Sequence, residues 1–300
     1  MATPGRYFQA ESGRAALGQT MEPESERAMA DELTAALKGV AAGQAGAAAG
    51  AEAGAESQAG GDNGTNPASN TTTAIITNQF YQLEGGNKIN INYFRLKYPV
   101  LEKKGGFLVE IPFQYLDFDN PVDLQVGGLG DIKFQFSYNL FTNPCRKTTF
   151  LTINELYIPS ADNVSLSAVP DSNEFVAQDI GSGKFVFGPG VGVVWAPRPD
   201  FIFAPLYFYE FDFAGDSARQ EIRRGKWRIF MMKAWESGRY VLPELQIVTN
   251  YLNGDNDVYF APEMGKSFKG ATFYIKPGIG IDPGINNRQW GLEIGTRINY

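Results

Sequence analysis

The last twelve residues of the chain, 289–300, constrain the fold more than any other stretch. Even-numbered positions from Trp290 to Tyr300 carry apolar, aromatic or β-branched side chains, whereas the odd-numbered positions from Gly291 to Asn299 carry glycine, charged or amide residues. This alternation predicts a strand with one apolar and one polar face. Chain ends of soluble proteins usually fray. A transmembrane β-barrel instead needs a well-formed last strand that pairs with the first and closes the wall.

Alternating patterns recur along the chain from Thr71 onward. In the clearest example, 132–140, apolar and polar residues alternate at every position. Similar apolar ladders are found at 107–115, 185–195, 201–213 and 273–281. Less regular strands fit at 73–83, 88–98, 148–158, 224–235, 240–250 and 257–267. With the last strand these make about twelve, an even number that suits a barrel of this type.

The connections between these strands alternate in length. Tight turns are expected at 101–105, 142–147, 196–200, 236–238 and 268–270. Mostly longer loops are expected at 117–129, 159–182, 214–223, 254–256 and 282–288. This rhythm is typical of a barrel with both chain ends on the periplasmic side. We therefore predict an all-β, transmembrane, antiparallel up-and-down barrel of about 12 strands over residues 71–300.

The two faces of each strand receive different roles in this interpretation. In a soluble barrel the apolar ladders would face inward. Here the face opposite the ladders carries charges of both signs, so we assign that charged face to the lumen and the ladders to the outside. The lumen-facing candidates are Glu110, Lys133, Gln135, Glu210, Lys276, Glu293 and Arg297. The residues expected to face lipid or to close the wall are Trp290, Leu292, Ile294, Ile298 and Tyr300. Mixed charge indicates internal ion pairs, or a weakly selective lumen if water fills it.

Composition argues against several functions. The chain has no histidine, which removes Ser-His and Cys-His catalysis and every His-ligated metal site. Its single cysteine, Cys145, cannot form an intramolecular disulfide. The net charge of -7 disfavours a nucleic-acid partner. No apolar run is long enough for a membrane helix. We expect no enzymatic activity, no cofactor and no metal site.

Residues 1–70 differ from the rest of the chain. After a weakly amphipathic stretch at 22–40, the sequence is rich in Ala and Gly and then in Gly, Asn, Ser and Thr. A segment with so little apolar surface to bury is expected to be a disordered arm. It suits a spacer better than a tether for a partner. The first twenty residues lack a signal-peptide pattern, although an outer-membrane location requires one.

The glycine-rich motifs of the chain do not fit known nucleotide-binding loops. Neither 127–131 nor 188–192 leads into a helix, so phosphate-loop and dinucleotide interpretations fail. The oxygen-rich stretch 253–257 lacks the full pattern of a calcium loop and is better explained as a turn. The basic run 223–226 suits either lipid phosphates or solvent.

Three stretches carry a family resemblance. The run from Gly127 to Ile132, the stretch 180–184 with Gly188-Pro189-Gly190, and the stretch 239–243 resemble signatures of the "MetA-pathway of phenol degradation" family. Its members are bacterial outer-membrane transporters. The resemblance covers about residues 75–300 and implies a barrel that passes small, hydrophobic or aromatic molecules. It supplies no catalytic or binding residues.

These observations lead to a functional hypothesis. We expect passive or facilitated passage of small solutes, including hydrophobic or aromatic ones, across the outer membrane of a Gram-negative-type bacterium. The alternative is a closed structural barrel that acts through its external loops. Expected partners are outer-membrane lipid, the barrel-assembly machinery and a small-molecule solute, with no nucleic acid.

Overall fold

The computed structural model describes residues 66–118, 124–143, 147–161, 166–168, 175–177, 181–217, 219–284 and 286–300. Most of the predicted arm therefore lies outside the described residues, as does Cys145. Within the part that the structure describes, no helix is long and apolar enough to cross a bilayer. The chain divides into two units at Glu56, and the second, Ser57–Tyr300, contains every element described below.

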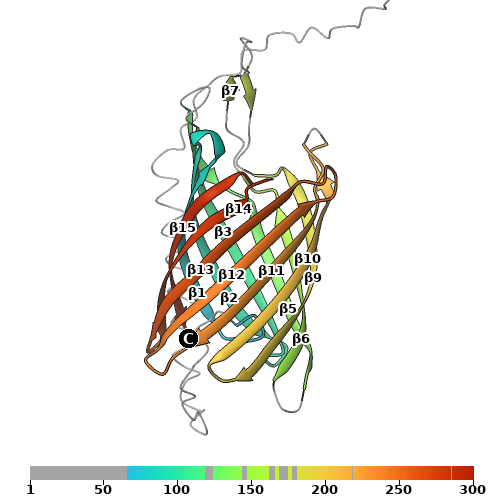
Figure 1. Cartoon of the computed structure of the whole chain (residues 1–300). Helices are drawn as coiled ribbons and strands as arrows, with labels where there is room; N and C mark the ends of the chain where they lie inside the picture. The colour runs from blue at the N-terminus through green and yellow to red at the C-terminus, as the bar shows by residue number, and fades with distance from the viewer. Residues whose placement is uncertain are drawn as a thin grey trace, which may run out of the picture. The chain divides into compact units, whose positions relative to one another are not determined.

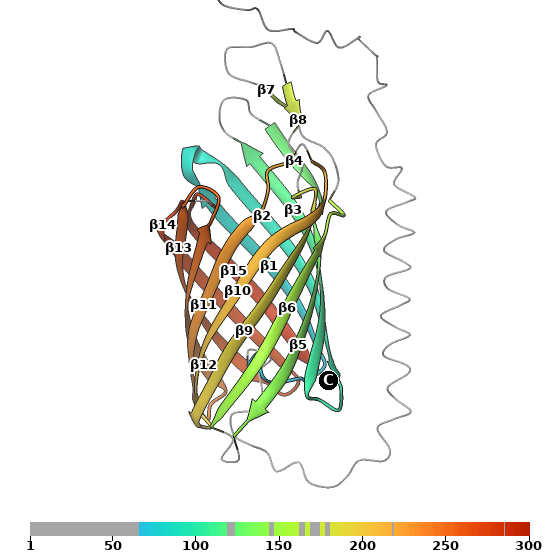
Figure 2. The ribbon, with the colours of Figure 1, turned by 90° about the vertical axis from the view of Figure 1, so that its right-hand side faces the viewer.

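The described residues build a closed antiparallel wall of twelve strands (Figures 1 and 2). Each strand of the wall pairs with its neighbours in the chain, which is an up-and-down order, and β1 pairs with β15 to close the ring. The twelve strands are β1 (Thr73–Leu83), β2 (Lys88–Val100), β3 (Gly105–Phe118), β5 (Ile132–Thr142), β6 (Thr148–Ile158), β9 (Lys184–Arg198), β10 (Phe201–Gly215), β11 (Arg223–Ala234), β12 (Arg239–Asn250), β13 (Asn256–Phe268), β14 (Ala271–Asp282) and β15 (Arg288–Asn299). The fold predicted from the alternation is confirmed.

Three short strands lie outside this count. β7 (Leu166–Ala168) and β8 (Phe175–Ala177) pair with each other in the connection between β6 and β9. β4 (Leu124–Leu129) continues the line of β5 along β3. Between the pairs Phe113↔Leu129 and Glu110↔Lys133, three residues of one strand face two of the other, so the break is a β-bulge.

The two ends of the barrel differ in the length of their connections. At one end, which we call the short-turn end, tight turns join β2–β3, β5–β6, β9–β10, β11–β12 and β13–β14, and the C-terminus lies at the same end (Figure 1). Most connections at the opposite end, the loop end, are longer, and the 3-10 turn Glu84–Gly86 is the shortest of them. The predicted rhythm of turns and loops is therefore present.

The outer face of the wall is apolar. Large side chains that are exposed on it include Phe213, Ile281 and Trp290. All four tryptophans of the chain belong to this set: Trp195 and Trp235 near the short-turn end, and Trp227 and Trp290 near the loop end. An apolar surface that encircles a barrel, with aromatic residues toward both rims, is the surface of a transmembrane barrel.

The closing strand ends as the sequence predicts. β15 pairs with β1 from Thr73↔Asn299 to Leu83↔Arg288. Beyond it, the backbone N–H of Tyr300 donates to the carbonyl of Thr72 at 3.0 Å, and the side chain is 70% exposed. The ring of Tyr300 therefore packs against little of the barrel, although its backbone extends the closing seam.

We predict that deletion of Tyr300 lowers the yield of inserted barrel more than it lowers any transport per inserted molecule. The reason is that the deletion shortens the seam on which closure depends while leaving the lumen unchanged. Heat-modifiable gel migration of the membrane fraction measures the yield. Tyr300→Phe keeps the aromatic end and should insert normally. A normal yield after the deletion would contradict the prediction.

Candidate solute pathway

The barrel encloses a cavity of about 590 Å³. It is bordered by Asn66 and Pro67, near the short-turn end, and by Leu83 and Asn286, near the loop end. Most of its remaining lining is charged or aromatic, with Arg95, Lys97, Glu110, Lys133, Glu155, Lys226, Arg228, Glu244, Glu263, Lys276, Arg288, Glu293 and Arg297 among the ionisable residues and Tyr81, Tyr93, Tyr157, Tyr259 and Tyr274 among the aromatic ones. The alternation of the strands points these side chains inward because the apolar positions between them face out.

A charged belt runs around the middle of this cavity. We define it as Arg95, Glu110, Lys133, Glu155, Glu210, Lys226, Arg228, Glu244, Glu263, Lys276, Glu293 and Arg297. One arc of the belt alternates in sign across five strands. Glu110 accepts from Arg95 and lies 3.1 Å from the Nζ of Lys133, which lies 3.6 Å from Glu155. Glu155 is also 2.7 Å from the Nζ of Lys226. Each of the two carboxylates, Glu110 and Glu155, therefore contacts two cations.

The arc continues onto β10 through Glu210. The Nζ of Lys226 lies 2.5 Å from Glu210, and Arg224 pairs with the same carboxylate. Glu210 is 1% exposed and lies behind Lys226, which borders the cavity. Cross-strand register explains part of the arc, because Arg95 faces Glu110 and Glu110 faces Lys133 directly.

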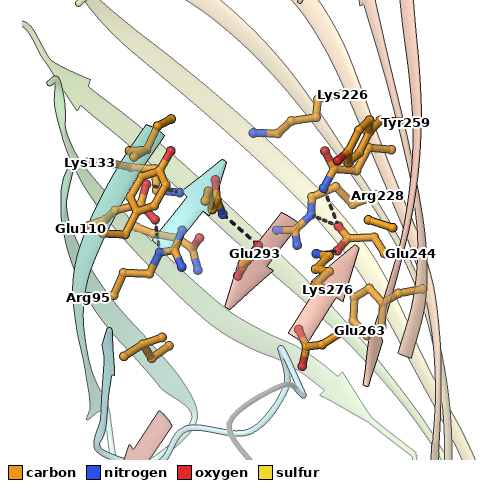
Figure 3. A pocket seen from close by; sticks show the side chains of 18 of the residues that line it. Arg95, Glu110, Lys133, Lys226, Arg228, Glu244, Tyr259, Glu263, Lys276 and Glu293 are labelled. Carbon is orange, nitrogen blue, oxygen red and sulfur yellow. Dashed lines mark hydrogen bonds and ion pairs between the residues drawn. The ribbon is translucent and has the colours of Figure 1, made fainter. Parts of the chain in front are cut away.

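A second group of charges lies on the opposite side of the cavity. Figure 3 shows Arg95, Glu110 and Lys133 on one side and Arg228, Glu244 and Lys276 on the other. Glu244 accepts from the Nε of Arg228 at 2.6 Å and from the Nζ of Lys276 at 2.5 Å. Buried ion pairs of this kind add little net stability, but loss of one partner leaves a costly unpaired charge. The belt is therefore self-neutralising, and its pairing fixes where the charges lie.

The rest of the belt is tied to tyrosines. Arg297 makes a bidentate pair with Glu263, at 2.8 and 2.9 Å. Tyr240 donates to Glu263 at 2.6 Å. The hydroxyl of Tyr274 donates to Glu293 at 2.8 Å. Tyr240 thus shares Glu263 with Arg297, and Tyr274 shares Glu293 with the amide of Gln79.

Inward glycines make room for these rings. A Cβ added at Gly265 would lie within 2.5 Å of the Tyr240 ring, and one at Gly295 would lie 2.5 Å from the Tyr274 hydroxyl. In the same way, Phe208 lies over Gly190. The inward glycines of β9 therefore do not thin the wall, because side chains of β10 fill the space that they leave.

We predict that Gly295→Ala destabilises the barrel by about 1–3 kcal/mol, as overpacking generally does, because the new methyl group must displace the Tyr274 ring. The urea midpoint of the folded gel band measures the change. Gly127→Ala is a matched control, since the nearest atom to its added Cβ is 3.4 Å away. Equal midpoints for Gly295→Ala and the wild type would contradict the prediction.

Part of the lumen wall toward the short-turn end is apolar. Twelve buried side chains form one cluster there: Leu151, Ile153, Val194, Ile202, Ala204, Leu206, Phe208, Phe230, Met232, Tyr240, Leu242 and Tyr274. Many of them lie within a few residues of the tight turns. This cluster was not predicted from the sequence, which assigned the inner face of every strand to polar residues.

The residues that precede β1 pack against the barrel toward this end. Ala68 packs against the apolar cluster, and its carbonyl accepts from the Nδ2 of Asn139 at 2.9 Å. Lys97 donates to the carbonyl of Ser69, and Asn70 donates to the carbonyl of Lys103 at 3.0 Å. We call residues 66–70 the inner segment. Although they were assigned to the arm, these residues contact the inside of the barrel.

A buried polar group marks the loop end of the cavity. Asp257 is 0% exposed and accepts from Arg288 at 2.5 Å. The guanidinium of Arg288 lies 4.3 Å from the centre of the Tyr259 ring. Within the described residues, no group of three or more acidic or Cys side chains is placed to hold a metal ion.

Six of the seven lumen candidates border the cavity: Glu110, Lys133, Gln135, Lys276, Glu293 and Arg297. Glu210 lies behind Lys226 as described above. On the outer face, Trp290, Ile294 and Tyr300 are exposed, and Ile298 is half-buried. Leu292 is also half-buried and borders the cavity, although its alternation matches that of Trp290. Sequence reasoning missed Arg95, Glu155, Lys226, Arg228, Glu244 and Glu263.

Two of the stretches that carry the family resemblance meet at the loop end. Asp131 accepts from the backbone N–H and the hydroxyl of Ser182, both at 2.7 Å. A Cβ at Gly181 would lie 2.3 Å from the Asp131 carboxylate. The hydroxyl of Ser160 donates to the carbonyl of Gly130 and accepts from the N–H of Ile132. These motifs therefore hold the β4–β5 bulge in place and have no phosphate-binding geometry.

Comparison with known proteins places the fold. No protein-family model matches the chain, and no curated protein matches it by sequence. Among solved structures, it is similar to the COG4313 outer membrane channel from Pseudomonas putida F1, with a TM-score of 0.63, 12% identity and coverage of 80% of this chain and 98% of that chain. The likeness is one of fold.

Two porins give weaker matches. The KdgM porin has a TM-score of 0.50 and 10% identity, with coverage of 76% of this chain and 99% of that chain. The NanC porin has a TM-score of 0.50 and 12% identity, with coverage of 76% of this chain and 100% of that chain. The three neighbours are an outer membrane channel and two porins by name, and the likeness in fold agrees with the twelve-stranded wall described above.

Proposed function

We propose that the chain is an outer-membrane channel for the passive or facilitated passage of small solutes. The observation that carries the proposal is the internal cavity of about 590 Å³, which reaches from the inner segment to the residues of the loop end. Its walls hold paired charges at mid-height, which offer hydrogen bonds to the polar groups of a solute. The likeness in fold to outer-membrane channels and porins supports the same function.

We further propose that the solutes are hydrophobic or aromatic molecules that carry a polar group. Tyr81, Tyr93, Tyr157 and Tyr259 border the cavity together with Ile75, Ile89, Ile91 and Leu108. Rings and aliphatic side chains suit an apolar body, whereas the belt offers hydrogen bonds to a polar substituent. The resemblance to the "MetA-pathway of phenol degradation" family supports this solute class. Outer-membrane lipid and the barrel-assembly machinery are the partners that such a location requires.

Single-channel recording and liposome flux test the proposal. Purified protein in a planar bilayer should give discrete openings, and proteoliposomes should take up a small phenol-type solute faster than empty liposomes. An oligosaccharide, which exceeds the cavity in size, should not enter. Absence of both conductance and flux in wild type and in the variants with an opened lumen described below would refute the channel function.

A closed barrel is the second candidate. It is favoured by the apolar cluster and the inner segment, which pack against each other toward the short-turn end of the lumen. In that case the loop end would carry the function through contact with a partner. A channel function requires the inner segment to move, so the two candidates differ in whether removal of that segment produces conductance.

A further inference from the structure

A groove of about 760 Å³ lies on the outside of the barrel at the short-turn end. It crosses β12, β13 and β14 and is bordered by Trp235 and Ser237 from the turn that precedes β12. Its exposed apolar residues are Trp235, Met264, Phe273 and Ile275. The groove is separate from the internal cavity that carries the proposed function.

Cross-strand register explains the shape of the groove. Val241, Met264 and Ile275 face one another in one row across the three strands. Arg239, Lys266 and Phe273 form the next outward row, nearer the turns. Between these rows lies Gly265, whose neighbours Tyr240 and Tyr274 are buried on the inner side of the wall. The space between the rows is therefore open to the outside.

The groove has an unusual pair of charges at its rim. Arg239 and Lys266 lie directly opposite each other on β12 and β13, and both are exposed. Among the described residues, neither has a carboxylate partner. Two other cations at the short-turn end do have a carboxylate partner, because Arg198 and Lys233 both pair with Asp200. Like charges directly opposite each other destabilise an antiparallel pair, so an anion between them would relieve the repulsion.

The position of the pair along the strands identifies a suitable anion. Arg239 is the first residue of β12, and Lys266 lies two residues before the end of β13. In a transmembrane barrel, the ends of the strands reach the headgroup region, and residues nearer the middle contact acyl chains. The cations are therefore at headgroup level, with Met264 and Ile275 one row deeper.

We propose that this groove binds an anionic phospholipid of the leaflet at the short-turn end. The lipid phosphate lies between Arg239 and Lys266, and the hydroxyl of Ser237 is available to donate to the headgroup. One acyl chain follows the row of Val241, Met264 and Ile275, with Trp235 at its side. The site needs only insertion in a bilayer, so it stands even if the barrel passes no solute.

Native mass spectrometry of the full chain in a zwitterionic detergent tests the proposal. Phosphatidylglycerol should remain bound after detergent removal, and phosphatidylcholine with the same acyl chains should not. The double variant Arg239→Gln, Lys266→Gln should bind phosphatidylglycerol more weakly, on the order of tenfold, because two basic contacts are lost. A control variant, Lys103→Gln with Lys104→Gln, removes the same charge from another turn at this end and should bind as the wild type does.

A charge reversal separates lipid binding from folding. Arg239→Glu places opposite charges across β12 and β13, so the barrel itself should be at least as stable to heat as the wild type in detergent alone. Phosphatidylglycerol should raise the Tm of the wild type and leave that of Arg239→Glu unchanged. Equal binding of both lipids by the wild type, or undiminished phosphatidylglycerol binding by the Arg239→Gln, Lys266→Gln variant, would overturn the proposal.

Discussion

Replacement of Glu244 by glutamine is expected to lower the free energy of unfolding by about 3–5 kcal/mol. Glu244 is 1% exposed and accepts from both Arg228 and Lys276, so the substitution leaves two cations without their shared counter-charge. Glutamine has nearly the same shape, so packing changes little. The loss then comes from the charge itself.

Urea titration followed by the folded gel band measures this loss. Glu236→Gln, at an exposed tight turn, is the control and should unfold at the wild-type midpoint. Glu244→Gln also makes the lumen more positive, so the reversal potential of any ion current should shift toward the equilibrium potential of the anion. If Glu244→Gln unfolds at the urea midpoint of the control, the stability of the barrel does not depend on the charge of Glu244.

Deletion of residues 1–70 is expected to raise the single-channel conductance several-fold. The deletion removes the inner segment, whose contacts with Lys97, Lys103 and Asn139 hold it within the short-turn end. β1 begins at Thr73, so the wall keeps every strand. The apolar cluster stays in place, and the conductance should therefore remain below that of a wide pore.

Deletion of residues 1–65 is the matched control, because it keeps the inner segment. It should conduct as the full chain does. Equal conductance of the two deletion variants would show that the inner segment does not limit passage. If neither variant conducts in either current or flux measurements, the closed-barrel function is favoured over the channel.

The fold could be predicted from the sequence because successive side chains of every strand point alternately to lipid and to the lumen. Strands such as 132–140 alternate without a fault, and the structure has β5 at Ile132–Thr142. Turn length added a second, independent signal, since the two-residue turns 199–200 and 269–270 are at the short-turn end and the longest connections are at the loop end. Neither signal depends on contacts between residues that are far apart in the sequence.

The apolar part of the lumen could not be predicted in the same way. The ladder at 201–213 indicated the outward face of β10, but from Phe201 to Tyr209 the chain is apolar at every position, so no polar residue was available for the inward face of this part. In the structure Leu206 and Phe208 point inward and are 3% and 1% exposed, whereas Tyr209 is exposed. On β6, Leu151 and Ile153 are also buried inside. Inward side chains are apolar where they pack against one another inside the barrel. The sequence does not show at which height of the barrel this packing occurs.

The sequence predicted that charged side chains of the belt face the lumen, but it did not predict which of them form ion pairs. Glu110 and Lys133 follow the alternation of their strands and were identified. Glu155 was not, because its inward neighbours on β6 are apolar and the strand has no polar ladder. Its partner Lys226 is 71 residues away, and only the closed ring brings the two together at 2.7 Å. Such pairs need the strand order and register, which single-strand patterns do not contain.

The placement of the tryptophans makes the barrel its own optical probe of the bilayer. Because all four indoles lie on the outer wall, two toward each rim, intrinsic emission reports lipid contact at two depths and receives no direct contribution from a tryptophan in the lumen. Lipids brominated at different acyl positions should quench this emission in a depth-dependent way. A solute that crosses the lumen and leaves the emission unchanged has passed without disturbing the wall.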